Sequence, residues 1–320
     1  MSDLMHNIIF FFWYKIPRLI LIPFLPLSFV FYIIIYLRRF LLLYYFKRFT
    51  SKARIIIVGN LVVGGSGKTP FTIWLSKYLQ SKDKKTTIIS SGYGSTISSP
   101  VIIDSLSNPN EVGDEAILLS NKTQSTVVSS SNRIKSTKFC DTSQVDFIIH
   151  DDGLQHYGLN RQYEFIIENA NKRDNNFLLP CGPLREPKFF HKNADFILSN
   201  YTGSECPGFY SRISGVWSSV DKTKYDINDK KFSSCILITA IADDFSLVKE
   251  LKEHRIELIT YKYPDHYQFR ESDIPKVDQP ILVTEKDFVK IKPFCNENIY
   301  ILEQNIIPND KLLKLMEKLL

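Results

Sequence analysis

The feature that most constrains the fold is a glycine-rich turn between a short apolar run and a helical segment. Residues 54–60 (RIIIVGN) are almost entirely apolar, which is typical of a strand buried on both faces. Residues 69–80 (TPFTIWLSKYLQ) are predicted to form a helix, with Pro70 in its first turn. A strand, a glycine-rich turn and a helix in this order predict a phosphate-binding loop, or P-loop. The turn consists of Gly64, Gly65, Ser66, Gly67, Lys68 and Thr69.

The residue types in this turn suit a bound nucleotide phosphate. Glycines let backbone N–H groups approach phosphate oxygens without an intervening Cβ, and the helix N-terminus adds partial positive charge. Lys68 would contact the β- and γ-phosphates, and the Thr69 hydroxyl would ligate magnesium. Val62 stands where the strict G-x-x-x-x-G-K-[ST] pattern has its first glycine, so the turn departs from that pattern. The alternative, a chance match in a surface loop, is disfavoured by the flanking strand and helix.

The rest of the chain predicts an α/β fold. Strand candidates alternate with helical segments, which indicates a parallel sheet covered on both faces. These candidates are 86–91, 125–130, 145–151, 163–168 and 195–200. Residues 201–232 are polar and predict a hinge or β-ribbon, and a smaller α/β unit opens after them, with strand candidates at 234–242, 256–263 and 280–287. The predicted divisions are an N-terminal membrane-associated segment (1–48), a P-loop domain (49–205), a connector (206–232) and a smaller C-terminal domain (233–320).

The string HDDGLQH (150–156) follows the strand candidate VDFIIHD. A carboxylate at the carboxyl end of a parallel strand beside a P-loop suits a magnesium site, so Asp151 or Asp152 would hold the metal directly or through water. Paired aspartates at a strand end could instead cap a following turn or helix. His156 could bind a phosphate or simply stabilise a turn.

Four further strings carry candidate residues whose roles the residues alone leave open. Asp114 and Glu115 precede a helical segment and could cap it. The proline-rich loop PCGPLREP (180–187) presents Arg185, which suits an anionic oxygen. His266 lies between aromatic residues, a setting in which a lone histidine is more often structural. TEKD (284–287) ends another strand candidate, and a polar loop is the favoured interpretation.

The N-terminal part of the chain contains an apolar run without charged residues, at 19–37. A 19-residue helix approaches the ~30 Å thickness of a bilayer core at ~1.5 Å per residue. More positive charges follow the run than precede it, which places the rest of the chain in the cytoplasm. Pro23 and Pro26 interrupt the run, so a helix lying in the membrane plane competes with a true span.

Composition excludes some partners and favours others. The formal net charge of +6 is mild and fits an anionic membrane surface or a phosphorylated substrate. No basic block with interleaved aromatic residues indicates nucleic acid, so we expect none as a partner. The five cysteines match no zinc or disulfide spacing, which predicts reduced thiols in a cytosolic compartment.

Taken together, these strings resemble the tetraacyldisaccharide 4′-kinase family, the lipid A kinases of Gram-negative bacteria. The resemblance is ordered along nearly the whole chain, and its most specific parts are VGNLVVGGSGKTP and DDGLQH. The matching strings after the apolar N-terminus are 58–70, GYG (92–94), GDEA (113–116), NR (132–133), 151–156, GPLREP (182–187), PDHYQF (264–269) and TEKD (284–287).

The resemblance implies transfer of the ATP γ-phosphate to the 4′-hydroxyl of a tetraacylated glucosamine disaccharide 1-phosphate, giving lipid IV-A. It implies two α/β/α domains joined by a β-ribbon, with ATP and Mg²⁺ between them, at the cytoplasmic face of the bacterial inner membrane. Asp114 matches the family's proposed catalytic base, with His266 as its support and Glu115 near the metal. Lys68 and Thr69 match the phosphate and magnesium residues, and Asp151 and Asp152 the metal side.

Some residues depart from the family pattern. Ser91 stands where an arginine is expected, which puts one anion contact in doubt, and Ala116 and His150 replace a proline and an apolar residue. The alternative function is a membrane-attached P-loop ATPase or GTPase that switches a protein partner. Such proteins usually carry an N-K-x-D motif or a signature lysine at position 63, where this chain has Val63. A scaffold with an inactive P-loop would be expected to lose Lys68 or the aspartate pair.

Overall fold

The computed structural model describes residues 12–14, 16–91, 97, 99–104, 106–142, 144–169, 175–192, 194–200 and 205–319. The GYG string at 92–94 therefore lies outside the described residues, as do residues 1–11 of the N-terminal segment and 201–204 of the polar stretch 201–232.

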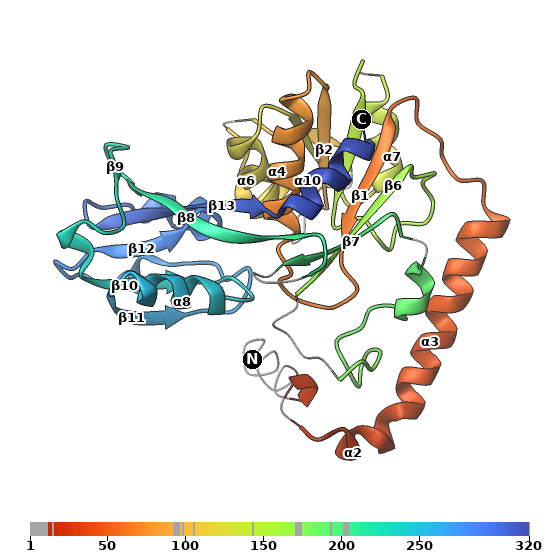
Figure 1. Ribbon diagram of the computed structural model, residues 1–320, viewed down its shortest axis with the longest axis horizontal. Helices are drawn as coiled ribbons and strands as arrows, with labels where there is room; N and C mark the ends of the chain where they lie inside the picture. The colour runs from red at the N-terminus through yellow and green to blue at the C-terminus, as the bar shows by residue number, and fades with distance from the viewer. Residues whose placement is uncertain are drawn as a thin grey trace.

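One continuous mixed sheet runs through both halves of the molecule (Figure 1). The strand order is β11-β10-β12-β13-β8-β7-β6-β1-β5-β2-β4-β3, with β9 paired to β8. Nine of the strand pairs are parallel, which confirms the predicted α/β class. The strands are β1 Arg54–Gly59, β2 Thr86–Ser90, β3 Val101–Ile102, β4 Thr126–Ser129, β5 Phe147–Asp151, β6 Tyr163–Glu168, β7 Phe196–Asn200, β8 Gly208–Ser218, β9 Lys224–Tyr225, β10 Ser234–Thr239, β11 Glu257–Lys262, β12 Ile281–Thr284 and β13 Ile299–Pro308.

Most helices lie between the strands in sequence and pack on the sheet, and two precede the first strand. The α-helices are α2 Arg18–Leu21, α3 Leu25–Phe40, α4 Lys68–Gln80, α5 Pro109–Val112, α6 Asp114–Lys122, α7 Arg133–Cys140, α8 Phe245–Glu253, α9 Glu285–Ile291 and α10 Asp310–Met316. A single π-helical turn, Leu41–Tyr45, extends α3, and short 3-10 turns occupy 22–24, 188–191, 230–232, 271–273, 292–294 and 317–319.

Strand β1 is buried on both faces, as its apolar run predicts. Because side chains alternate along a strand, Ile56 and Val58 enter one core cluster and Ile55 and Ile57 another. The first cluster packs under α4 and α6, and the second lies under the loops that carry Leu154 and Leu184. This burial fixes the carboxyl end of β1, from which the glycine-rich turn leaves the sheet.

We call the part with strands β1 to β7 the first half and the part with strands β9 to β12 the second half. The two halves are joined through β8 and β13, which pair antiparallel along nine residues of each strand with a register shift at Glu303. Figure 1 shows these two long strands running from the first half into the second. The sequence placed a β-ribbon within 206–232. Strand β8 lies in that range, but its long partner is β13, because strand pairing over about ninety residues leaves no local signal. The exact domain boundaries stay a prediction, since Leu312 and Met316 of α10 pack in the first half's core.

The apolar N-terminal helix is present as predicted, along one side of the molecule (Figure 1). Residues Leu19–Tyr45 form a helix long and apolar enough to cross a membrane by length and composition, and little of it is buried. Its contacts with the rest of the chain run along its length. Ser28 Oγ donates to the Leu178 carbonyl at 2.8 Å, and Arg38 donates to the Gln155 carbonyl at 3.2 Å.

Candidate active site

The glycine-rich turn has a backbone that its glycines make possible. Gly64 and Gly67 adopt φ values of 106° and 86°, a region in which side chains with a Cβ are strained. A Cβ on Gly67 would lie 2.4 Å from the Asn200 side-chain nitrogen, which donates a hydrogen bond to the Ser66 carbonyl at 3.0 Å. Helix α4 begins at Lys68, directly after this turn. The turn therefore directs a helix N-terminus and a lysine toward one site.

The departure at Val62 has a structural reason. Val62 forms an isolated antiparallel bridge with Leu184, and the Val63 N–H donates to the Pro183 carbonyl at 2.9 Å. An extended residue in a bridge does not need the conformational freedom of glycine. The proline-rich loop at 182–187 therefore supports the entrance to the P-loop.

Asp151 lies at the end of β5, fully buried against the first turns of α4. Its two carboxylate oxygens accept hydrogen bonds from Thr69 Oγ1 at 3.1 Å and Thr72 Oγ1 at 2.9 Å. Burial raises the pKa of Asp151 to about 6, and the neighbouring Glu115 carboxylate adds to this effect. The pKa of Asp151 is thus raised mainly because its carboxylate is buried, and a neighbouring carboxylate makes the next largest contribution.

Asp152 faces the opposite electrostatic situation. Lys68 Nζ lies 3.7 Å from its carboxylate, and one Arg185 nitrogen lies 3.2 Å from both carboxylate oxygens. Burial alone would raise the pKa of Asp152, but Lys68 and Arg185 outweigh it and lower the pKa below its usual value. Asp152 also adopts a φ of 51°, unusual for a residue with a side chain, so the DDG turn is tightly constrained. A turn rather than a helix follows it, so only the helix part of the capping alternative is wrong.

The residues at this point fit a magnesium ion that also contacts nucleotide. Carboxylate and hydroxyl oxygens are ligands that Mg²⁺ prefers, and Thr69, Asp151 and Asp152 supply only these. Among the described residues, no group of three or more His, Cys, Asp or Glu side chains could hold a metal unaided. Mg²⁺ usually binds through one or two carboxylates together with substrate phosphates and water, so this donor set fits a nucleotide-bound metal.

Asp114 is the first residue of α6 and meets residues from the second half of the molecule. His266 Nδ1 lies 3.2 Å from each of its carboxylate oxygens, and Lys290 Nζ lies 3.1 Å from Oδ2. Burial would raise the pKa of Asp114, but the hydrogen bond from His266 and the charge of Lys286 lower it well below the usual range. Asp114 is therefore ionised at neutral pH and held from two directions.

Glu115 is oriented by Lys286, which lies on α9 as Lys290 does. Lys286 Nζ lies 3.1 Å from the Glu115 carboxylate and 3.0 Å from that of Asp265. Burial opposes the charge on Lys286, but Glu115 and Asp265 raise its pKa above the usual value. The interface between α6 and α9 thus contains paired opposite charges.

TEKD is not the polar loop that the sequence favoured. Thr284 caps α9 by accepting from the Asp287 N–H at 3.1 Å, and Lys286 projects into the site. Asp287 is fully buried and accepts from the Ala240 N–H at 3.1 Å. A threonine followed by acidic residues is a helix-start pattern, and this signal was available in the sequence.

A comparison with known proteins assigns the chain to a family. The family model described as tetraacyldisaccharide-1-P 4′-kinase matches residues 20–320. The tetraacyldisaccharide 4′-kinase of Pseudoalteromonas translucida is 35% identical over 318 residues, covering 96% of this chain and 95% of that protein. The enzyme of the same name from Legionella pneumophila (strain Corby) is 35% identical over 294 residues, covering 89% of each chain.

The chain belongs to the tetraacyldisaccharide 4′-kinase family. A solved structure of LpxK from Aquifex aeolicus, described as an "apo" form in complex with ATP, superposes with a TM-score of 0.77. It is 28% identical and covers 93% of this chain and 99% of its own. These relatives are kinases, so the partner-switching alternative is not favoured.

Arg185 and His156, the two residues predicted to contact substrate, lie in different electrostatic surroundings. Arg185 is drawn to Asp152, and its backbone N–H donates to the Leu61 carbonyl at 2.7 Å. His156 lies nearby, but burial, together with the charges of Arg133 and Arg38, lowers its pKa to about 4. The imidazole is therefore neutral at pH 7, so it could contact a phosphate only through a hydrogen bond.

Sequence reasoning assigned no role to Arg133, although it quoted the string NR. Arg133 is almost fully buried, and its guanidinium donates to the Ile89 carbonyl at 2.5 Å and to the Asp151 carbonyl. Burial lowers its pKa to about 10, which leaves it charged at neutral pH. It therefore joins the carboxyl ends of β2 and β5 beside the aspartate pair. The sequence analysis also assigned no role to Lys286 or Lys290. Their spacing of four residues, which places two lysines on one face of a helix, was the available signal.

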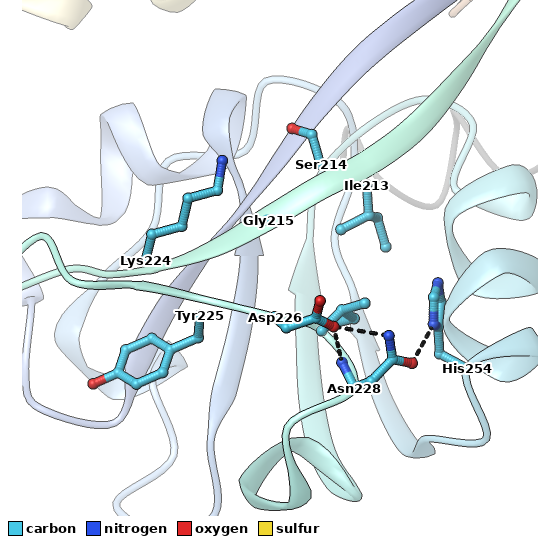
Figure 2. A pocket seen from close by; sticks show the side chains of 9 residues that line it. Ile213, Ser214, Gly215, Lys224, Tyr225, Asp226, Asn228 and His254 are labelled. Carbon is cyan, nitrogen blue, oxygen red and sulfur yellow. Dashed lines mark hydrogen bonds between the residues drawn. The ribbon is translucent and has the colours of Figure 1, made fainter.

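A separate pocket lies in the second half of this kinase-family chain, away from these residues. Its volume is about 450 Å³, and Asp226, Asn228 and His254 form a hydrogen-bonded row at one side of it (Figure 2). None of the predicted site residues lines it. The concentration of ionised and metal-suited groups is instead at the P-loop.

Proposed function

We propose that the protein transfers the γ-phosphoryl group of ATP to the 4′-hydroxyl of an acylated glucosamine disaccharide 1-phosphate. The observation that carries this proposal is the meeting, at one site, of a P-loop, an aspartate pair and the Asp114–His266 pair. The P-loop and the aspartate pair suit nucleotide and metal. The Asp114–His266 pair suits an acceptor hydroxyl, which a kinase needs and a simple nucleotide switch does not.

The donor side of the reaction is assigned to the P-loop and its partners. Residues 64–69 would bind the ATP phosphates through backbone N–H groups and the Lys68 ammonium. Mg²⁺, held by Thr69, Asp151 and Asp152 with Glu115 near it, would neutralise charge that develops on the phosphate oxygens. The closeness of the Asp151, Asp152 and Glu115 carboxylates supports this assignment, because a divalent cation would balance part of their charge.

On the acceptor side, Asp114 is the proposed base. Phosphoryl transfer passes through a loose transition state, so the hydroxyl proton can leave late and a weakly basic carboxylate can accept it. His266 and Lys290 hold that carboxylate ionised and oriented. Arg185 is proposed to contact an anionic oxygen of the substrate, since it is partly exposed and its guanidinium already pairs with a carboxylate. His156 is proposed as a neutral hydrogen-bonding neighbour.

The site is proposed to lie between the two predicted domains. On one side are the P-loop and α6, and on the other are α9 and the loops that carry His266 and Ala242. A Cβ on Gly65 would lie 3.2 Å from the Ala242 Cβ, which supports a close approach of the second half to the P-loop.

A labelled-phosphate experiment tests the reaction. Purified protein is incubated with γ-labelled ATP, magnesium and the tetraacylated disaccharide 1-phosphate dispersed in detergent, and the lipid fraction is separated. We expect label in the lipid and none without magnesium. Lipid-independent nucleotide hydrolysis with no labelled lipid would contradict the proposal.

We also propose that α3 lies in the plane of a membrane and does not cross it. Its contacts with the rest of the chain extend from Ser28 to Arg39, a distance of roughly 16 Å at ~1.5 Å per residue. A helix docked along this length cannot cross the bilayer without immersing the polar loops beneath it. Its outward side is apolar instead, with Leu27, Val30 and Ile34 each more than half exposed.

Vesicle binding tests this membrane proposal. The triple variant Leu27→Asn, Val30→Asn and Ile34→Asn is compared with a control in which three exposed apolar residues elsewhere, Leu106, Val220 and Ile259, become Asn. We expect at least tenfold weaker co-flotation with anionic phospholipid vesicles for the first triple variant only. Equal co-flotation of both variants would refute the assignment.

The predicted cytoplasmic side rests on the basic residues after the apolar run. A reporter fused to the C-terminus tests this part of the proposal. A reporter enzyme that works only in the cytoplasm should be active in this fusion. A reporter enzyme that works only after export should be inactive.

A further inference from the structure

The C-terminal end of α3 is fixed to the rest of the molecule through Arg39. One guanidinium nitrogen donates to the Tyr157 hydroxyl at 2.9 Å, and another donates to the Phe190 carbonyl at 2.7 Å. The same guanidinium lies over both aromatic rings, 4.7 Å from the Tyr157 centroid and 4.5 Å from that of Phe190. Arginine is suited to this task because its planar fork can hydrogen-bond and stack at once.

Behind Arg39, the contacts continue into the protein interior. The Tyr157 hydroxyl donates to Glu186 Oε2 at 2.6 Å, and His191 Nε2 lies 2.9 Å from the same oxygen. Tyr157, Glu186 and His191 are only 2%, 2% and 3% exposed. Burial and the neighbouring Glu186 raise the pKa of Tyr157, so the phenol keeps its proton and can donate while it accepts from Arg39. We call Arg39, Tyr157, Phe190, Glu186 and His191 the Arg39 network.

This network joins two segments that carry site residues. Tyr157 lies in the segment that begins with Asp151 and Asp152, five residues after the latter. Glu186 directly follows Arg185, whose guanidinium pairs with Asp152. A shift of Glu186 would therefore carry Arg185 with it, and a shift of Tyr157 would be felt at the DDG turn. In a well-packed interior, such shifts are passed on to neighbouring groups rather than absorbed.

We infer that Arg39 is a positioning residue for the kinase site: it couples the seating of α3 to the placement of the Arg185–Asp152 pair. This inference rests on the proposed function for its catalytic consequence, but the coupling itself is a property of the fold. When α3 is seated, the network holds the 182–191 loop and the 152–157 segment in register. When Arg39 is lost, both segments loosen, whereas the Ser66 carbonyl within the glycine-rich turn is still held by Asn200.

Hydrogen exchange on the full-length protein without substrate tests the coupling first. Arg39→Gln is compared with Arg255→Gln, which makes the same change at an exposed arginine in the second half of the chain. We expect at least tenfold faster exchange in segments 154–157 and 184–191 for Arg39→Gln, and unchanged exchange in α4. Exchange in these segments that matches Arg255→Gln would overturn the inference.

A second variant covers the case in which Arg39→Gln unfolds. Tyr157→Phe keeps the ring and the net charge but removes the hydroxyl that joins Arg39 to Glu186. We expect the same local increase in exchange, at a smaller size of about three- to tenfold. Wild-type exchange in Tyr157→Phe would mean that the network does not transmit the position of α3, and the inference would fall.

The kinetic test uses detergent-dispersed lipid, so that membrane attachment is not limiting. For Arg39→Gln and Tyr157→Phe we expect kcat to fall at least tenfold with the ATP dissociation constant changed less than twofold. Arg39→Lys, which keeps the charge but not the fork, should recover only part of the loss. A merely structural role would weaken ATP binding and kcat together, and that result would contradict the inference. If the wild type labels no lipid, the proposed function fails, while the exchange result still decides the coupling.

Discussion

The Nδ1 atom of His266 lies 3.2 Å from both carboxylate oxygens of Asp114, although 152 residues separate the two in sequence. The pair bridges the two halves of the molecule, so the proposed base is complete only when these halves meet. Lys290 reaches the same carboxylate from α9. Asp114 therefore depends on two other segments of the chain, the loop with His266 and helix α9, for its orientation.

Asp114→Ala should reduce kcat by about 10²- to 10⁴-fold, the range typical for a lost acid–base group. The ATP dissociation constant should change little, because the described hydrogen bonds and ion pairs of the Asp114 side chain go to Glu115, His266 and Lys290 and not to the P-loop. His266→Ala should cost less, since Lys290 still holds the carboxylate. Single-turnover phosphorylation and calorimetric ATP binding measure the two effects separately. Full activity in Asp114→Ala would exclude it as the base.

Gly67→Ala should destabilise the protein and abolish nucleotide binding. Its φ of 86° strains a residue with a Cβ, and that Cβ would lie 2.4 Å from the Asn200 amide. We expect a loss of about 1–3 kcal/mol in unfolding free energy, measured by urea denaturation. Combining it with Asn200→Ala removes the collision but not the strain, so stability should recover only in part. A double variant no more stable than Gly67→Ala would show that the collision is not the cause.

Asp151→Asn should stabilise the metal-free protein at pH 8 while abolishing magnesium-dependent turnover. The pKa of Asp151 is raised to about 6 in the folded protein, mainly by burial, so folding favours the protonated form. The stability that this group contributes is present below its ordinary pKa near 4 and is lost as the pH rises through about 6. Asparagine mimics the protonated form, so we expect a gain of about 1–3 kcal/mol at pH 8 that vanishes below pH 4.

The adjacent residue supplies a matched control of opposite sign. The pKa of Asp152 is lowered because Lys68 and Arg185 outweigh the effect of burial. Its ionised form therefore stabilises the fold above its ordinary pKa, and this stability is lost as the pH falls. Asp152→Asn should destabilise the protein at pH 8, as measured by thermal unfolding across pH. Shifts of the same sign in both variants would contradict this account.

Lys122→Met should weaken the connection between α6 and the second half. Lys122 Nζ lies 2.6 Å from Glu285 and 3.4 Å from Glu303, and its removal leaves both partly buried carboxylates without this partner. We expect a loss of about 1–3 kcal/mol in unfolding free energy, below the cost for a fully buried pair. Adding Glu285→Gln should restore part of it in a double-mutant cycle. Strictly additive losses would show that the pair is not coupled.

Much of the first half could be predicted because its signals are local. The continuous apolar run of β1, the glycines of the turn and the start of α4 lie within about thirty residues, and each has one strong physical interpretation. The aspartate pair gained meaning only from its expected place beside that turn. Strand β11 confirms the candidate at 256–263, although it lies at the sheet edge and is largely exposed, unlike the other strand candidates.

The missed residues share a different property, since their roles arise from distant partners. Lys290 looks like an ordinary helix lysine until Asp114 is placed 3.1 Å away. Arg39 looks like a membrane-flanking charge until it is seen against Tyr157 and Phe190. Likewise, the second strand of the β-ribbon is contributed by β13, far along the chain from β8. No local pattern encodes such pairings, because they depend on tertiary packing.

The return of α10 to the first half has a consequence for synthesis. Leu312 and Met316 fill the same core as Ile56 and Phe71, although they are encoded near the other end of the described chain. On the ribosome, the apolar N-terminal helix and the nucleotide-binding half emerge first, yet that half lacks part of its interior until residues 310–319 have been made. The apolar N-terminal helix is therefore synthesised well before the kinase half has a complete core. Translation order thus delays completion of the first half's core until after the second half has been made.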